Sequence, residues 1–145
     1  MNDTVYWRLR FLGCELRSDL IGGDYMRRWV LRTPIGMLRI HHILRSDDDR
    51  HFHDHPMDFV SFIVRGGYVE HRPGKEPAVC QAGSVVVRRA EDLHALKLLG
   101  RSAWTLVFTG PVRRRWGFQT EGGWIDADVY AAWRAGKHVA VGVES

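Results

Sequence analysis

Residues 53–67, with the sequence HDHPMDFVSFIVRGG, contain the pattern that decides the fold of this 145-residue chain. His53 and His55 stand two residues apart, and side chains at this spacing point to the same side of an extended strand. The apolar run that follows is typical of a further strand, and the glycine pair 66–67 predicts the turn that ends it. The segment therefore predicts consecutive strands, the first with two histidines on one face.

A third histidine, His94, lies far enough along the chain to belong to a different strand. Imidazole is the usual nitrogen ligand of Zn, Fe, Cu and Ni in proteins. Three histidines that meet from separate stretches of chain could occupy three positions around one metal ion. We therefore treat His53, His55 and His94 as candidate metal ligands, against the alternative that each is an ordinary hydrogen-bonded strand histidine.

The composition is that of a globular protein. Hydrophobic residues make up 45% of the chain, which is too many for a disordered segment. The apolar runs are far shorter than the roughly 20 residues that a membrane-spanning helix needs. The polar start, residues 1–4, does not resemble a secretory leader. We expect a cytoplasmic protein that does not contact a membrane.

The net charge of +4 could attract nucleic acid or an anionic substrate. The arginines are scattered along the sequence, however, and only residues 113–115 form a run of three. Scattered charges are typical of solvated strand edges, where they also prevent unwanted strand pairing. We therefore expect a small-molecule substrate and no nucleic-acid partner.

Turn signals separate many short predicted strands, at the spacing that is typical of a sandwich or barrel. Residues 25–31 and 37–44 predict a hairpin, whereas residues 6–12 could form either a strand or a packed arm. Further strands are expected at residues 51–55, 59–64, 68–71, 79–81, 85–88, 94–98 and 102–108.

A short helix is expected near the end of the chain, over about residues 127–135. Asp126 can cap its start and Gly136 can end it, with Val129, Tyr130 and Trp133 on the face that packs against the sheet. No linker or change of composition divides the sequence. We therefore predict one domain over residues 1–145, with its core at about residues 25–120.

These motifs resemble those of the cupin superfamily, whose members are small jelly-roll β-barrels. The second cupin motif, G-x5-P-x-G-x2-H-x3-N, fits in register at Gly83 and His94. The chain departs from that motif at three positions, Arg89, Glu91 and Leu98. The likeness covers roughly residues 37–120. It implies an all-β fold, a single-domain cupin jelly-roll β-barrel with a short C-terminal helix.

The first cupin motif, G-x5-H-x-H-x(3 or 4)-E-x6-G, fits in two registers. If His53 and His55 are the histidine pair, the closing glycine falls at residues 66–67, but residues 59–60 supply no carboxylate. The glycine that should precede the pair is absent in either register. Pro56, directly after the pair, also matches many cupins.

In the other register His51 and His53 are the pair, and Asp58 takes the carboxylate position. The position of the closing glycine would then be occupied by Arg65. We prefer the pair of His53 and His55, because a slip of one residue would turn the whole strand face outward. Whether His51 or Asp58 also binds the metal stays open.

Cupins with three histidines and no glutamate ligand resemble thiol dioxygenases and β-diketone-cleaving enzymes. The resemblance implies one divalent metal ion, with Fe(II) favoured and Zn(II) as an alternative, and a mononuclear non-haem iron oxygenase. Two other functions remain open. One is a cupin lyase or isomerase that acts on a sugar or keto compound without redox chemistry, and the other is a non-enzymatic ligand-binding cupin. Cupins often pair through exposed strands, so the resemblance is also compatible with a homodimer.

Residues near the histidines supply further candidates. Tyr68 and Glu70 share one face of their strand and, if that face lines the barrel, could bind substrate and act as acid or base. A metal-bound histidine normally donates its second N–H to a carboxylate or carbonyl group, for which Asp54 and Glu91 are candidates. Three arginines could instead bind a substrate anion: Arg65, Arg88 and Arg89.

Overall fold

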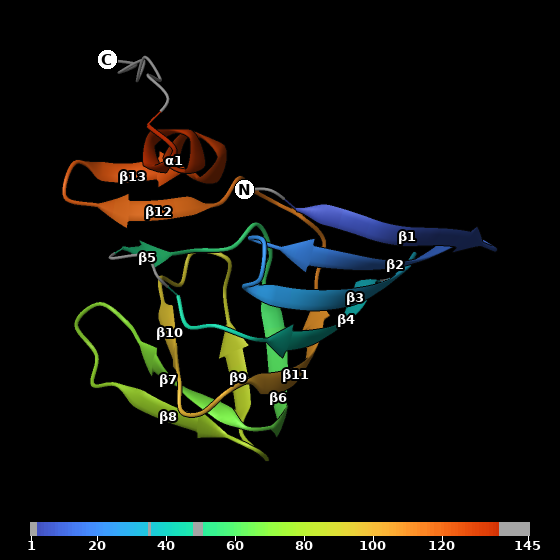
Figure 1. The fold of residues 1–145 in the computed structure, drawn as a ribbon, viewed down its shortest axis with the longest axis horizontal. Helices are drawn as coiled ribbons and strands as arrows, with labels where there is room; N and C mark the ends of the chain where they lie inside the picture. Colours follow the sequence, from blue (N-terminus) through green and yellow to red (C-terminus); the bar gives the residue numbers. More distant parts are fainter. Residues whose placement is uncertain (1–2, 35, 48–50, 137–145) are drawn as a thin grey trace.

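The computed structural model describes residues 3–34, 36–47 and 51–136, which form thirteen strands and one helix (Figure 1). The elements are β1 (Thr4–Phe11), β2 (Cys14–Ile21), β3 (Met26–Thr33), β4 (Gly36–Ile43), β5 (Phe52–His53), β6 (Phe59–Arg65), β7 (Gly67–His71), β8 (Ala78–Gln81), β9 (Val85–Arg88), β10 (Ala95–Leu98), β11 (Ala103–Thr109), β12 (Gly117–Thr120), β13 (Gly123–Asp126) and α1 (Ala127–Arg134).

The strands form one large sheet and two small ones. The large sheet has the order β1-β2-β3-β4-β11-β6-β9, and the small sheets have the orders β10-β7-β8 and β13-β12-β5. All their pairings are antiparallel. Both small sheets lie to the same side of the large sheet, one above the other in Figure 1. The predicted all-β jelly roll with a C-terminal helix is confirmed.

Gly66 marks the point where the chain leaves the large sheet for a small one. β6 belongs to the large sheet and β7 to the sheet with β10 and β8. Gly66 has a φ of 71°, in the left-handed region, and a Cβ atom there would collide with the backbone oxygen of Ser102. A Cβ on Gly67 would lie 2.5 Å from the carbonyl oxygen of Cys80. Both positions therefore require glycine.

Strand alternation places one face of the large sheet inward. On β4, Met37 and Ile43 are buried, whereas Ile40 on the opposite face is 42% exposed. The main core cluster lies between the large sheet and the β10-β7-β8 sheet and is formed by Ile43, Ile63, Tyr68, Cys80, Val86 and Ala103. The predicted hairpin of residues 25–31 and 37–44 is present as β3 and β4.

The outer face of the large sheet is unusually apolar. The register places Val87, Val60 and Phe108 side by side, and Leu38, Leu31, Leu16 and Leu9 continue this row across β4, β3, β2 and β1. Most of these side chains are more than a third exposed. An apolar patch of this extent is typical of a surface that contacts another protein.

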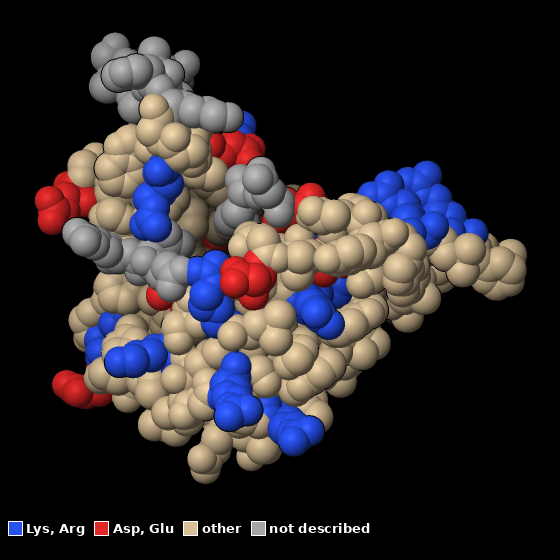
Figure 2. Space-filling model, viewed as in Figure 1, with Lys and Arg blue, Asp and Glu red and all other residues tan. Residues whose placement is uncertain are grey.

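The N-terminal residues form a hairpin, β1–β2, that extends the large sheet to one side (Figure 1). The sequence was compatible with either a strand or a packed arm here. The segment forms a strand, and every residue of β1 is exposed. In Figure 2 a group of basic side chains lies on this hairpin, and other Lys and Arg side chains are spread over the body of the protein. Arg8 and Arg10 on β1 both lie near Glu15 on β2.

The C-terminal helix begins after Asp126, whose side chain accepts a hydrogen bond from the backbone N–H of Asp128, as predicted. The helix packs on the β13-β12-β5 sheet, where Tyr130 stacks on Phe118 with ring centroids 3.9 Å apart. The expected packing face is only partly correct, because Trp133 is 54% exposed. Within the part of the chain that the structure describes, no helix has the length and apolar character to cross a membrane.

Candidate metal centre

Backbone pairing brings the three candidate histidines together. His53 pairs with Phe118 on β12 and forms an isolated antiparallel bridge with His94. In this bridge each residue donates its backbone N–H to the carbonyl oxygen of the other, with both N···O distances 2.9 Å. His55 follows two residues later, and its backbone N–H donates to the carbonyl oxygen of Ala90. The strand is shorter than the predicted 51–55, since β5 ends at His53.

The three rings converge on one point. One ring nitrogen from each of His53, His55 and His94 lies within 4.8 Å of the other two. The Nε2 atoms of His55 and His94 are only 2.7 Å apart. Two nitrogens bound at right angles to one ion, each at about 2.1 Å from it, are about 3 Å apart. The spacing of this pair therefore fits adjacent positions around a single metal ion.

Burial keeps the imidazoles of His53 and His55 neutral. Desolvation, together with the neighbouring His94 ring, lowers the pKa of His53 to about 4. Desolvation also holds the pKa of His55 well below its ordinary value, with smaller contributions from His53, His94 and Arg39. A neutral imidazole offers the lone pair that a metal ion requires. A set of three imidazole donors therefore fits a transition metal such as Fe or Zn.

Glu70 orients His94 from behind. The Nδ1 N–H of His94 donates to Oε1 of Glu70 at 2.7 Å, which leaves Nε2 to face the centre. Arg88 donates to both oxygens of the same carboxylate, with Nε 3.0 Å from Oε1. Glu70 is 1% exposed, and its hydrogen bonds to His94 and Arg88 outweigh desolvation and lower its pKa to about 2.

These contacts bear on the role that the sequence suggested for Glu70. An acid or base in the cavity needs a free carboxylate that can exchange protons near pH 7. Both oxygens of Glu70 are occupied, and the low pKa keeps the group ionised. Glu70 makes the contact to a candidate ligand for which Asp54 and Glu91 were the sequence candidates, and its role as acid or base stays a prediction. Arg88, a candidate anion ligand, is the partner of Glu70.

Tyr68 is buried on the inward face of β7 and lines the cavity beside the histidines. Burial raises the pKa of its phenol above the ordinary value, so that the hydroxyl group stays protonated. It can donate a hydrogen bond to a bound molecule, and the sequence prediction that it contacts substrate stays a prediction. The other two candidate arginines, Arg65 and Arg89, are exposed and do not line the cavity.

His51 and Asp58, the alternative ligands, lie elsewhere. Nδ1 of His51 is 3.0 Å from the hydroxyl group of Tyr130 on α1. Oδ1 of Asp58 accepts hydrogen bonds from the backbone N–H of Ala90 and from Arg113, each at 2.7 Å. Among the described residues, neither belongs to the group of potential ligand atoms around His94.

Asp54, between the two paired histidines, fastens the C-terminal hairpin to β5. Its Oδ1 accepts the backbone N–H of Gly117 at 2.7 Å. Its Oδ2 accepts hydrogen bonds from Nη1 of Arg114 at 2.5 Å and from the indole N–H of Trp124 at 2.9 Å. The side chain is thus turned away from the metal centre, as alternation predicted, but it holds the sheet on which His53 is placed.

Replacement of Asp54 by alanine should destabilise the protein by about 2 kcal/mol, because three donors lose a buried acceptor. Thermal and urea unfolding monitored by circular dichroism would measure this change. Glu76→Ala, in an exposed loop, is the matched control and should leave stability unchanged. Equal stability of the two variants would contradict the anchoring role of Asp54.

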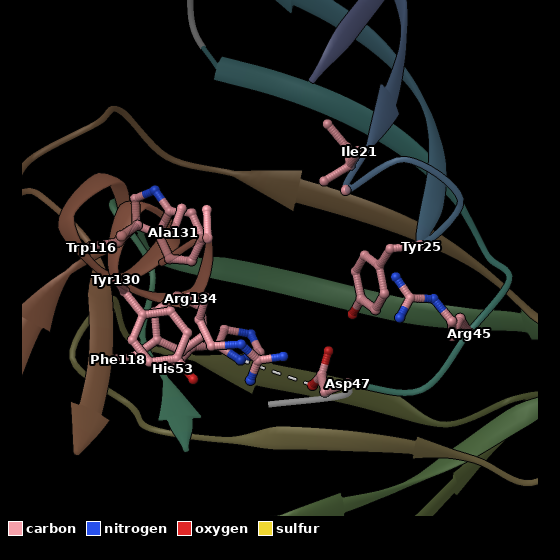
Figure 3. A pocket seen from close by; sticks show the side chains of 13 residues that line it. Ile21, Tyr25, Arg45, Asp47, His53, Trp116, Phe118, Tyr130, Ala131 and Arg134 are labelled. Carbon is pink, nitrogen blue, oxygen red and sulfur yellow. Dashed lines mark ion pairs between the residues drawn. The ribbon is translucent and has the colours of Figure 1, made fainter. Parts of the chain in front are cut away.

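Two cavities meet at His53. The inner one, of about 380 Å³, lies inside the barrel and is lined by all three histidines. The outer one, of about 500 Å³, lies between the barrel and α1 and is also lined by His53. Figure 3 shows the His53 ring beside Asp47, with Trp116, Phe118 and Tyr130 on one side. Ile21, Tyr25 and Trp116 also line both cavities, so the two cavities lie next to each other.

The fold is similar to those of solved cupin proteins, whereas the sequence matches no family model and no curated protein. A cupin-2 domain protein from Rhodospirillum rubrum has a TM-score of 0.56 and 17% identity, over 90% of this chain and 93% of that chain. The DMSP lyase DddQ from Ruegeria pomeroyi has a TM-score of 0.54 and 18% identity, over 77% of this chain and 59% of that one.

Hydroxypropylphosphonic acid epoxidase from S. wedmorenis is also similar, with a TM-score of 0.50 and 16% identity over 59% of this chain. The chain spans 51% of the length of the epoxidase, as against 59% of the lyase. At these identities the likeness is one of fold. The chain has the cupin fold, and its chemistry has to be argued from its own residues.

Proposed function

We propose that this cupin-fold protein is a metal-dependent small-molecule enzyme in which His53, His55 and His94 hold one divalent metal ion. The observation that carries this proposal is the convergence of three ring nitrogens, from buried His94 and partly buried His53 and His55, within 4.8 Å of one another. The carboxylate of Glu70, which fixes the tautomer of His94, gives further support, because metal-binding histidines normally have such a partner.

The metal that we favour is Fe(II), and the reaction is an oxygenation. Three neutral ligands leave the full positive charge on the ion, which favours an anionic substrate. When bound, Fe(II) would supply open positions for O₂ and substrate, whereas Zn²⁺ would act as a Lewis acid. The protein supplies the walls of the cavity: Phe59 packs against His55, and Trp116 lies beside His53.

A lyase reaction without redox chemistry is the second candidate. The specific support is the similarity to a DMSP lyase, which extends over more of this chain than the similarity to the epoxidase. In that case the same three histidines would hold the metal. Tyr68, which stays protonated, could bind the substrate by a hydrogen bond.

Metal analysis of the purified protein tests the proposal directly. We expect about one equivalent of Fe or Zn per chain, measured by inductively coupled plasma mass spectrometry. A protein that holds no metal, even after anaerobic incubation with Fe(II) or Zn(II), would refute it.

Oxygen uptake then separates the two reactions. An electrode assay of the iron-loaded protein with small thiols and β-diketones should show substrate-dependent O₂ consumption if the protein is an oxygenase. A lyase would form product under anaerobic conditions and consume no O₂. Binding of small molecules without turnover under either condition would favour the ligand-binding alternative.

A further inference from the structure

The inner cavity has a second polar region besides the histidines, on the inward face of β3, β4 and β11. Arg28, Arg39, His41 and Thr109 all line the same cavity as His53, His55 and His94. The register sets Arg28 directly opposite His41. The positive charge of Arg39 lies near enough to His55 to contribute to the lowered pKa of that imidazole. The two polar regions therefore belong to one site.

Arg39 is a cation without an anionic partner. Its Nη2 contacts only two thioether sulfurs, at 3.2 Å from Met57 and 3.7 Å from Met37. Its Nε is buried and has no hydrogen-bond acceptor. No carboxylate among the described residues forms an ion pair with it. Burial and the neighbouring Arg28 lower its pKa to about 10, so that the guanidinium is still charged at neutral pH.

Arg28 illustrates the contrast, since it stands on the neighbouring strand and is fully paired. Its Nη2 and Nε donate to Oδ2 of Asp19, at 2.7 and 3.1 Å. The same aspartate accepts Arg17 at 3.1 Å. The single buried carboxylate of this region is therefore already shared by two arginines. Arg39 forms no ion pair of its own, and the carboxylate of Asp19 offsets its charge only from a distance.

Two more polar atoms around the cavity lack a partner. Nε2 of His41 and Oγ1 of Thr109 are both buried, and neither forms a hydrogen bond. Burial and the charges of Arg28 and Arg39 lower the pKa of His41 to about 3, so that this ring is neutral. A buried polar group without a partner is costly, and an unpaired charge costs more. Three such groups around one cavity indicate a missing ligand.

We propose that Arg39 forms an anion-binding subsite that holds the carboxylate, or a comparable oxyanion, of a small organic acid whose other end faces the three histidines. A guanidinium suits this task because its parallel N–H groups match the two oxygens of a carboxylate. Thr109 and His41 supply further hydrogen-bonding atoms. This proposal names the substrate class of the proposed function, and so rests on it.

The walls between the two regions fit a short apolar chain. Met57 is buried against Arg39, while Phe59 packs on the ring of His55. A cavity of about 380 Å³ is at the small end of the range for ligand sites. The substrate is therefore a small acid with an apolar middle, held at its anionic end by Arg39.

The test compares a carboxylate with its uncharged isostere. Butyrate and butyramide are titrated by isothermal calorimetry into metal-free wild-type protein, Arg39→Met and Arg39→Lys. Wild type should bind butyrate at least about tenfold more tightly than butyramide, the difference that a charge-assisted hydrogen bond gives. Arg39→Met should lose this difference, and Arg39→Lys should keep part of it. Arg27→Met, on the outward face of β3, removes the same charge as a control and should bind like wild type.

The wild-type comparison needs no variant to fold, and equal affinity for butyrate and butyramide would overturn the proposal. Retention of the full preference in folded Arg39→Met would overturn it as well. The melting temperature of Arg39→Met should be equal to that of wild type or higher, because an unpaired and partly buried charge is removed.

Zinc binding by the same proteins separates this proposal from the proposed function. Arg39→Met should bind Zn²⁺ at least as tightly as wild type, since Arg39 contacts none of the three histidines and its positive charge disfavours a cation beside His55. A wild-type protein that prefers butyrate but takes up no metal would refute the metal enzyme and leave the subsite standing. A protein that binds metal without any preference for butyrate would refute the subsite alone.

Discussion

The His94→Ala variant is expected to purify with less than about one tenth of the metal found in wild type. His94 contributes one of three ligand nitrogens, and its Nε2 lies 2.7 Å from that of His55. Loss of an outer hydrogen-bond partner alone lowers metal affinity about 10- to 100-fold. Loss of the ligand itself should therefore lower it by more than about 100-fold, measured by competition with a chromophoric zinc chelator.

A second readout comes from the linkage between binding and folding. Added Zn²⁺ should raise the melting temperature of wild type, because an ion that binds only the folded state stabilises it. His94→Ala should show no such rise. His71→Ala provides the control, since His71 lies at the end of β7 and outside the three-histidine group. If His94→Ala retained wild-type metal content and His71→Ala lost it, the centre would have to be placed elsewhere.

Much of this centre follows from local sequence rules. The spacing of His53 and His55 dictates that both side chains share one face, and the glycines at 66–67 fix where β6 ends. The second motif set His94 at a fixed distance from Gly83, although three of its positions differ. The fold and the candidate ligand set could therefore be predicted from a few residues whose spacing is constrained by strand geometry.

The groups behind the histidines could not be predicted in the same way. Glu70 reaches His94 because β7 pairs with β10, in a register that sets Glu70 opposite Leu96. That pairing joins residues from distant parts of the sequence, and alternation within one strand contains no information about it. The sequence placed Glu70 on the right face but could not say that Arg88 and His94 occupy its oxygens.

Arg39 was not predicted as a site residue for a different reason. Inward positions of a strand are expected to be apolar, so Arg39 and His41 between Met37 and Ile43 look like interruptions of the pattern. Alternation alone could have signalled them, because it places all four side chains on the same inward face. Polar residues that break a pattern are expected at functional sites.

The N-terminal hairpin could not be assigned from the sequence because β1, the strand at the edge of the large sheet, is exposed along its whole length.

The Glu70→Leu variant is expected to lose about 3 to 5 kcal/mol of unfolding free energy, because it leaves the Arg88 guanidinium partly buried without its partner. Arg88 donates two hydrogen bonds to Glu70, and His94 donates a third. Urea unfolding monitored by tryptophan fluorescence measures this loss. A loss below about 1 kcal/mol would show that the ion pair contributes little to the fold.

The same carboxylate should make stability depend on pH. Because the pKa of Glu70 is lowered from 4.5 to about 2 in the folded protein, its contribution is fully present above about pH 4.5. It should be lost as pH falls toward 2, by about 3 kcal/mol in all. Glu70→Gln lacks the titrating group, so the difference in stability between wild type and this variant should shrink from pH 5 to pH 3. A constant difference across this range would contradict the assignment.

The double variant Glu70→Leu/Arg88→Met separates the two roles of Glu70. Replacing a buried ion pair by apolar side chains of similar size often restores stability, so this protein should unfold near the wild-type urea midpoint. Its affinity for Zn²⁺ should stay about 10- to 100-fold below that of wild type, because His94 still lacks the carboxylate that fixes its tautomer. If stability and metal affinity were both restored, Glu70 would act on the fold alone and not as a positioning residue for the metal ligand.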